Sequence, residues 1–217
     1  MEASAAPSAF VELKEQHRLQ KRALIEAAAA RTFAEKGPDA ATVADVARAA
    51  GLSAGAIYLY FESRDELLFA TAVAEIGELE RRVQVSLEKV SDPEQALRAL
   101  VGAYFDFYRE RPEGFAMLMA GLQRSSRLRA PAEAVAAYDR GALRCLTFLH
   151  DIVERGMDEG TFRKGNAWEL TYAIWGTFHG VLQLAGNQPD RERFLGQTVS
   201  GLLETATEAL LGGMKTR

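Results

Sequence analysis

Signals that start or stop an α-helix recur along the whole chain, and they restrict it to a helical fold. Most of the six prolines stand where a helix would begin, as in Asp92-Pro93. Thr42 and Asp45 can cap a helix reciprocally, because each side chain can reach the other residue's free backbone N–H. No segment alternates polar and apolar residues long enough to predict a strand. We therefore predict an all-α fold of about nine helices.

The same signals give approximate bounds for these helices along the 217 residues. The first helix is predicted over 13–35, where Gly37-Pro38 stops it. Two short helices follow over 43–50 and 53–60, and a longer one covers 63–89. Later helices begin near residues 93, 112, 131 and 167. The last one follows a turn at 186–189, includes Phe194 and ends at Leu211.

Composition excludes several classes of protein. Cys145 is the single cysteine, so the chain can form no internal disulfide. The three histidines lack metal-ligand spacing, and we expect neither a metal nor a cofactor. No apolar run reaches the ~18 residues of a membrane span, and residues 1–9 lack the pattern of a signal peptide. Hydrolase and phosphate-loop motifs are missing. We expect a cytoplasmic protein that is not an enzyme and has no membrane partner.

Charge alone does not indicate a nucleic-acid partner, because 26 basic and 30 acidic residues give a net charge of −4. Residues 10–64 hold eight basic and seven acidic residues, so the acidic surplus lies behind them. Within the first helix, Lys14, His17, Arg18, Lys21 and Arg22 share an arc of about 140°. This basic face has two interpretations, as a contact for phosphates or as a solvated helix surface.

Two short predicted helices between residues 42 and 60 are joined by a tight turn. In the turn Ala50-Gly51-Leu52-Ser53, the glycine suits the bend and Ser53 can cap the second helix. This pattern is typical of a helix-turn-helix. In that geometry the second helix lies in the major groove of DNA, and its first residues meet the base edges.

The segment from Arg22 to Phe69 resembles the DNA-binding domain of the tetracycline-repressor (TetR) family of bacterial transcription regulators. The matching residues are Arg22, Ile25, Ala28-Ala29, Phe33, Gly37, Thr42-Val43, Val46-Ala47, Ala50-Gly51-Leu52-Ser53, Gly55, Ile57-Tyr58, Tyr60-Phe61 and Ser63-Arg64-Asp65-Glu66-Leu67-Leu68. Arg64 replaces the lysine usual in that family and keeps its charge. The resemblance implies an all-helical homodimer that binds operator DNA. We expect a disordered tail over 1–12, a DNA-binding domain over 13–69, and a domain for ligand and dimerisation over 70–217.

The expected DNA contacts come from this motif. The second helix carries no Arg, Lys, Asn or Gln over 53–58, so bidentate base reading is excluded there. Methyl contacts, phosphate contacts from tyrosine hydroxyls and DNA shape remain. Tyr60 has a second interpretation, as a side chain packed beside Phe61. The candidate DNA contacts are Thr42, Ala44, Ser53, Ala54, Gly55, Ala56, Tyr58, Tyr60, Arg64, Arg18 and Arg22.

The C-terminal part has more apolar helix surface than one chain can cover, which predicts pairing of its last two helices with a second copy. The candidate interface residues are Val181, Phe194, Val199, Leu202 and Ala206. A pocket for a small apolar ligand is predicted at Tyr104, Phe105, Tyr108, Met117, Phe148, Trp175, Phe178 and His179. Side chains of this kind also occur as ordinary core, and His179 can be a satisfied core histidine. The run Trp175 to Gly180 also resembles one TetR subgroup with a Trp and His-Gly pair.

The sequence as a whole predicts a homodimeric transcriptional regulator. By the resemblance it is a repressor that leaves a palindromic operator when a small apolar ligand binds. The alternative is an all-helical ligand-binding or adaptor protein whose helix-turn-helix is only structural.

Overall fold

The computed structural model describes residues 9–123, 127, 129–186, 190 and 192–216, and this part of the chain forms nine helices and one small hairpin. The predicted all-α fold is confirmed. The helices are α1 (Ala9–Lys36), α2 (Val43–Ala50), α3 (Ala54–Tyr58), α4 (Arg64–Leu87), α5 (Pro93–Glu110), α6 (Pro112–Leu122), α8 (Ala132–Asp158), α9 (Ala167–Gly186) and α10 (Val199–Met214). The hairpin pairs β1 (Arg193–Phe194) with β2 (Gln197–Thr198). None of the described helices is both long and apolar enough to cross a lipid bilayer.

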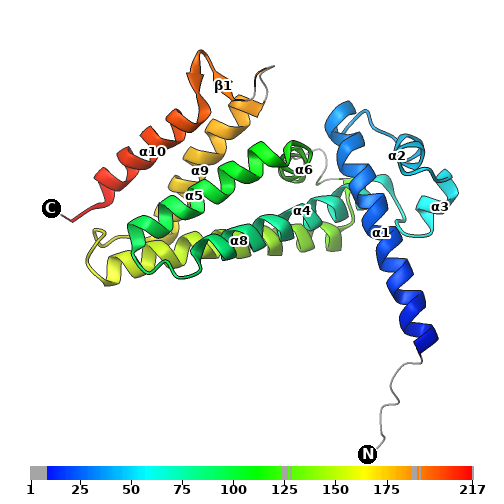
Figure 1. Cartoon of the computed structure of the whole chain (residues 1–217), viewed down its shortest axis with the longest axis horizontal. Helices are drawn as coiled ribbons and strands as arrows, with labels where there is room; N and C mark the ends of the chain where they lie inside the picture. Colours follow the sequence, from blue (N-terminus) through cyan, green and yellow to red (C-terminus); the bar gives the residue numbers. More distant parts are fainter. Residues whose placement is uncertain (1–8, 124–126, 128, 187–189, 191, 217) are drawn as a thin grey trace, which may run out of the picture.

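The elements form two regions joined by α4. Helices α1, α2 and α3 lie at one end, and the first turns of α1 project away from the molecule (Figure 1). Helix α4 runs from this end into the second region, where it packs against α5, α6 and α8. Helices α9 and α10 pack on each other at the side of α5 and α8. Because α6 packs against both α1 and α4, it joins the two regions a second time.

Local capping fixes the helix-turn-helix as the sequence predicts. Thr42 Oγ1 accepts from the backbone N–H of Asp45, and the Asp45 carboxylate accepts from the backbone N–H of Thr42. The hydrogen bonds from Lys36 and Thr42 hold the pKa of Asp45 far below its usual range, with Lys36 the larger cause. Gly51 closes α2 with φ 67°, a left-handed conformation that glycine adopts without strain.

Three helices have bounds that differ from the prediction. Helix α1 begins at Ala9, so residues 9–12 are helical and not a disordered tail, while residues 1–8 lie outside the described part. Helix α3 ends at Tyr58, two residues early. The last helix begins only at Val199 and continues to Met214, since a hairpin precedes it. Leu195 (φ 48°) and Gly196 (φ 84°) form its left-handed turn, and Phe194 lies on β1 instead of a helix.

Candidate DNA-binding surface and ligand cavity

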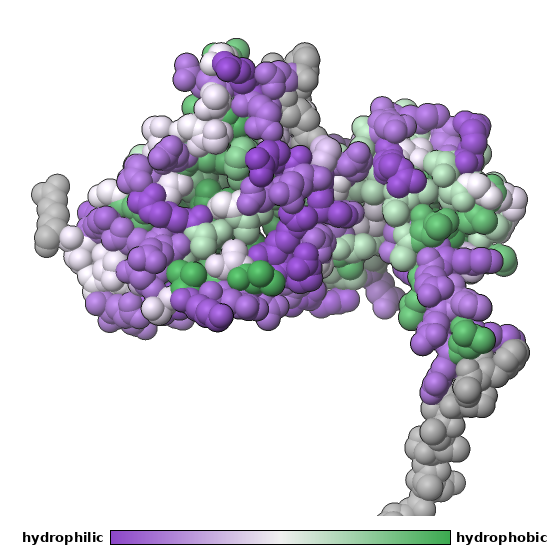
Figure 2. Space-filling view, in the orientation of Figure 1, coloured by the Kyte–Doolittle hydropathy of each residue, from purple (hydrophilic) through white to green (hydrophobic). Residues whose placement is uncertain are grey.

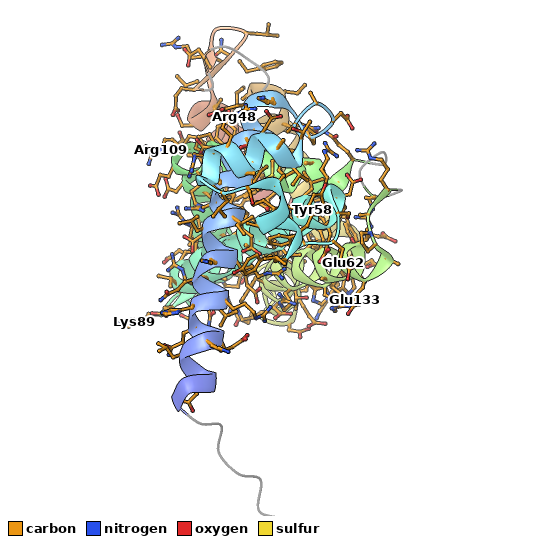
Figure 3. The ribbon with its side chains drawn as sticks, turned by 90° about the vertical axis from the view of Figure 1, so that its right-hand side faces the viewer. Arg48, Tyr58, Glu62, Lys89, Arg109 and Glu133 are labelled. Atoms are coloured by element: carbon orange, nitrogen blue, oxygen red, sulfur yellow. The ribbon has the colours of Figure 1, made fainter. Side chains whose placement is uncertain are left out.

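Helix α3 is held so that one side of it stays open to solvent. Ser53 Oγ accepts from the backbone N–H of Ala56 at 3.2 Å, and Ile57 is buried in the core. Tyr58, the next residue, lies on the solvent side and is 54% accessible. Figure 3 looks onto this end of the molecule, with Tyr58 near its middle and Arg48 above it. Hydrophobic residues reach the surface over the α2–α3 region (Figure 2).

Small residues surround Tyr58 on this face. Gly55 is exposed, and a Cβ atom added there would meet only Ser53 Oγ, at 3.9 Å. Ala54 and Ala56 are half-buried, while Thr42 and Ala44 are exposed on the preceding turn and helix. The predicted contacts on α2 and α3 are therefore exposed or half-buried, and their contact with DNA stays a prediction.

Arg48 is a basic residue of this face that the sequence reasoning missed. Its side chain is 77% accessible and pairs with Asp45 at 3.2 Å. The signal was present, because Arg48 stands four residues after Ala44 and so shares its helix face. A cation at this position can approach a phosphate beside α3.

Arg64 is held inside the protein and does not offer its guanidinium to the surface. Its Nε donates to the Ala41 carbonyl at 2.7 Å, and its Nη1 donates to Asp65 at 2.8 Å. The guanidinium also lies over the ring of Phe33, 5.5 Å from its centre. The expected phosphate contact is therefore replaced by a structural role, which ties the start of α4 to the helix-turn-helix.

Arg22 is likewise engaged within the fold. Its guanidinium carbon lies 4.5 Å from the ring centre of Phe61, and its Nε donates to Glu26 at 3.1 Å. Burial raises the pKa of Glu26, and the charge of Arg22 opposes that effect. These contacts fix α1 against the loop before α4, while the Arg22 side chain stays 34% accessible, so its contact with DNA stays a prediction.

The other four residues of the basic face of α1 meet Tyr60 in one surface hollow. The lining residues are Lys14, His17, Arg18, Gln20, Lys21, Leu24 and Tyr60. Arg18 is exposed and paired with Glu15 at 2.8 Å, a hydrogen bond that lowers the pKa of Glu15. Tyr60 is half-buried and packs against the core, as its second interpretation expects. The basic side chains of Lys14, Arg18 and Lys21 therefore gather in this hollow.

A second feature is an apolar cavity inside the bundle of α4, α5, α6, α8 and α9. Its empty volume is about 690 Å³, which includes the part open to solvent. None of its lining side chains is an acid, a lysine or an arginine. The lining residues are Ile76, Leu79, Val83, Leu100, Tyr104, Leu118, Met119, Leu122, Tyr138, Ala142, Cys145, Leu146, Leu149, Trp175 and His179.

Only part of the predicted ligand site lines this cavity, namely Tyr104, Trp175 and His179. The other predicted residues are placed elsewhere by the packing of their helices. Tyr108, Met117 and Phe178 are buried in the core, Phe148 is half-buried outside the lining, and Phe105 lies in a separate hollow beside α10. The sequence reasoning missed the wall formed by α4, because Ile76, Leu79 and Val83 have the spacing of ordinary core residues.

The polar groups of the cavity are few and uncharged. Tyr104 Oη and His179 Nδ1 are 2.9 Å apart and share a hydrogen bond. Tyr138 Oη donates to the Leu118 carbonyl at 2.7 Å. Burial lowers the pKa of His179 and raises that of the Cys145 thiol to about 12, so both groups are neutral at pH 7.

Helix α9 also exposes apolar residues that do not line the cavity. Trp168, Tyr172 and Leu184 are exposed there, and the spaces beside Gly176 and Gly180 are open. These five residues follow one another at intervals of four and so form one stripe.

The predicted interface residues divide between this surface and the core. Val181, Leu202, Ala206 and Phe194 are half-buried near the stripe or on α10 and β1. Val199 is fully buried within a single chain, so it belongs to the core and cannot contact a second copy.

One group of possible metal ligands occurs among the described residues. The ligand atoms of His150, Asp151 and Glu154 lie within 4.8 Å of one another. Asp151 and Glu154 are exposed, while the His150 ring stacks on Trp168 with centres 4.3 Å apart. Stacking on an aromatic neighbour explains the position of the histidine without a metal.

Comparison with known proteins identifies the family. The N-terminal model described as "Bacterial regulatory proteins, tetR family" matches residues 25–71, and "Tetracyclin repressor-like, C-terminal domain" matches residues 97–206. The chain is 32% identical over 99 residues to the transcriptional activator FasR of Mycolicibacterium smegmatis, which is 46% of this chain and 45% of that protein. It is 34% identical over 102 residues to the regulator BetI of Agrobacterium fabrum, which is 47% and 49% of the two chains. These matches therefore span about half the length of the curated relatives.

Solved structures share the fold over most of the chain. The fatty acid degradation regulator FadR from Bacillus halodurans has a TM-score of 0.73 at 22% identity, covering 88% of this chain and 98% of that one. The regulator PfmR from Thermus thermophilus has a TM-score of 0.70 at 24% identity, covering 89% and 99%. The family consists of transcriptional regulators and not of enzymes, as expected, while the subgroup with a Trp and His-Gly pair stays a prediction. This chain belongs to the TetR family of bacterial regulatory proteins.

Proposed function

We propose that the protein is a homodimeric transcriptional regulator that binds a palindromic operator and is released from it by a small apolar ligand. The observation that carries this proposal is the open face of α3, where Tyr58 stands among Gly55 and small alanines on a fully capped helix-turn-helix. Its partner is double-stranded DNA, so its place of action is the cytoplasm. Repression, as opposed to activation, follows from the family resemblance.

The exposed stripe on α9 supports the dimer. A contiguous apolar face with open glycine positions allows two helices to approach closely across a two-fold axis. Two copies then present two α3 helices, and a palindromic operator offers two matching half-sites about one DNA turn apart.

The position of the cavity supports release by a ligand. Helix α4 contributes Ile76 and Val83 to the cavity wall and begins at Arg64, beside the helix-turn-helix. Helix α6 contributes Leu118 and Leu122 and packs against α1. A ligand that moves either helix therefore changes the position of α3. The structural neighbour FadR from Bacillus subtilis was solved in complex with stearoyl-CoA, a compound with a long apolar chain.

Ion pairs reinforce both connections between the regions. Arg129, which follows α6, contacts Asp39 at 2.9 Å and Asp65 at 3.4 Å. Arg111, at the start of α6, holds the nearly buried Glu75 of α4 through bidentate hydrogen bonds of 2.8–3.0 Å. Hydrogen bonds to charged groups are directional, so a shift of α6 is passed to α4 and to the loop before α2.

A gel-shift titration with the DNA upstream of the protein's own gene tests the DNA partner. Gly55→Glu places a negative charge on the open face of α3 and should abolish the specific complex, because it faces the phosphates. Gly77→Glu is the matched control, since a side chain at that exposed position of α4 also meets open space. If the unaltered protein gives no specific complex, or both variants bind alike, the adaptor alternative replaces the proposal.

A further inference from the structure

The polar groups that Tyr104 and His179 bring to the cavity form one unit within an apolar wall. Tyr104 comes from α5 and His179 from α9, each is 9% exposed, and both line the cavity. The hydrogen bond between Tyr104 Oη and His179 Nδ1 joins them at 2.9 Å. The His179 ring also packs against Trp175, with ring centres 4.6 Å apart, which fixes its orientation.

The Tyr104–His179 pair has one hydrogen-bond donor that the described part of the protein does not use. Among the described residues, His179 Nε2 has no hydrogen-bond partner. If Tyr104 donates to Nδ1, the neutral imidazole carries its proton on Nε2 and can donate that proton. If Nδ1 donates to Tyr104 instead, the phenol hydrogen is the one left to donate. In either tautomer the pair offers one donor to a molecule in the cavity.

The rest of the cavity wall offers no partner that would stabilise a charged ligand group. Its other side chains are apolar or carry neutral groups already described, and none is a lysine or arginine. Burial favours the neutral form of His179, so the imidazole does not supply a standing positive charge. A buried carboxylate without a cation is costly, whereas a carbonyl needs only a hydrogen-bond donor.

We propose that the cavity selects an electrically neutral molecule with an apolar body and one acceptor oxygen, such as a ketone, an ester or an alcohol, which Tyr104 and His179 bind together. The proposal rests on the proposed function only in that it names the ligand class of the same cavity. It excludes free carboxylates as preferred ligands. The apolar body lies along α4, α6 and α8, whose side chains form the remaining wall.

Direct binding without DNA tests this selection. Trp168→Phe leaves Trp175, in the cavity wall, as the single tryptophan and so as a fluorescent reporter. In this background, 2-octanone and octanoate are titrated at pH 7.5. We expect 2-octanone to bind about tenfold more tightly or better, because octanoate must bury a charge. Absence of 2-octanone binding, or octanoate binding at pH 7.5 that is equal or tighter, would overturn the proposal.

Three variants separate the hydrogen bond from simple packing. Tyr104→Phe and His179→Phe should each weaken 2-octanone binding by about two- to tenfold, the loss of one hydrogen bond. Tyr138→Phe is the matched control, because that hydroxyl also belongs to the cavity wall but is already bound to the Leu118 carbonyl. Equal affinity in all three variants would show that the pair is only structural. Since no DNA is present, a failure here is distinct from a failure of operator binding.

Discussion

Tyr58 carries the one side-chain hydroxyl of α3 and is exposed, whereas Ser53 caps the helix from the preceding position. Tyr58→Phe keeps the ring and removes only the donor. We expect operator affinity to fall about fivefold, the loss of roughly 1 kcal/mol, measured by fluorescence anisotropy. Thr147→Val, which removes an exposed hydroxyl on α8, should leave affinity unchanged. An unaltered affinity for Tyr58→Phe would remove this contact from the interface.

Gly156 is a position of α8 that has no room for an added methyl group. A Cβ at this position of α8 would lie far inside van der Waals contact with the ring of Phe162, which is itself fully buried. Gly156→Ala should therefore lower the free energy of unfolding by about 1–3 kcal/mol. At the open position Gly77, the same change should raise it by about 0.5–1 kcal/mol through helix propensity. Urea denaturation of both variants checks the opposite signs.

Arg64 is a residue whose position the sequence predicts but whose binding partner it does not. Its position at the start of α4 was predicted correctly, and Ser63 caps that helix. The direction of its guanidinium depends on the Ala41 carbonyl and the Phe33 ring, which come from other elements. The sequence therefore shows that a charged residue lies beside the helix-turn-helix. Whether that residue binds a phosphate or a backbone carbonyl depends on tertiary packing.

Within α4, Glu78 makes stability depend on pH. Hydrogen bonds, first from Arg81 and then from Arg82, lower its pKa from 4.5 to about 2. Arg82 also donates to Glu110 of α5 at 2.8 Å, so this cluster joins two helices. A depressed pKa in the folded state stabilises the protein above the unfolded value, and the stabilisation disappears as the pH falls from 4.5 towards 2.

We expect Glu78→Gln to flatten the pH dependence of unfolding between pH 5 and 2, because its side chain no longer titrates. Urea midpoints measured across this range provide the comparison. Glu62→Gln, at an exposed glutamate before α4, serves as the control. Parallel pH profiles for Glu78→Gln and the unaltered protein would show that the cluster contributes no net coupling.

Elements whose ends are set by local chemistry were predicted well, and those set by tertiary contacts were not. Thr42 and Asp92 start α2 and α5 as expected, since each cap needs only residues within one turn. The start of α10 was misplaced because the hairpin before it has a leucine, Leu195, in a left-handed turn position. The sequence predicted the five helices that surround the cavity. It could not predict which face of each helix lines the cavity, because that depends on how the five helices pack together.

At the scale of the whole molecule, the proposed regulator needs two copies to read one operator. The α9 stripe is the surface proposed to link copy number to DNA binding, because its C-terminal end, Gly180 and Leu184, lies on a different face of the same helix from Trp175 and His179, which line the cavity. One helix thus touches both the cavity and the proposed interface. A ligand beside α9 can therefore change the spacing of the two α3 helices as well as the tilt of α4.

Leu184→Glu tests this link, since Leu184 is 52% exposed on the stripe. A charge buried at the interface has no partner there, so the variant should sediment as a monomer. It should also bind operator at least about 100-fold more weakly, because one α3 reaches only one half-site. Val85→Glu, at an equally exposed position of α4, should stay dimeric and bind DNA as before. If Leu184→Glu remains a dimer, the interface lies elsewhere. If it becomes a monomer and still binds tightly, the two half-sites are not read together, and cavity-driven changes in their spacing cannot be the means of release.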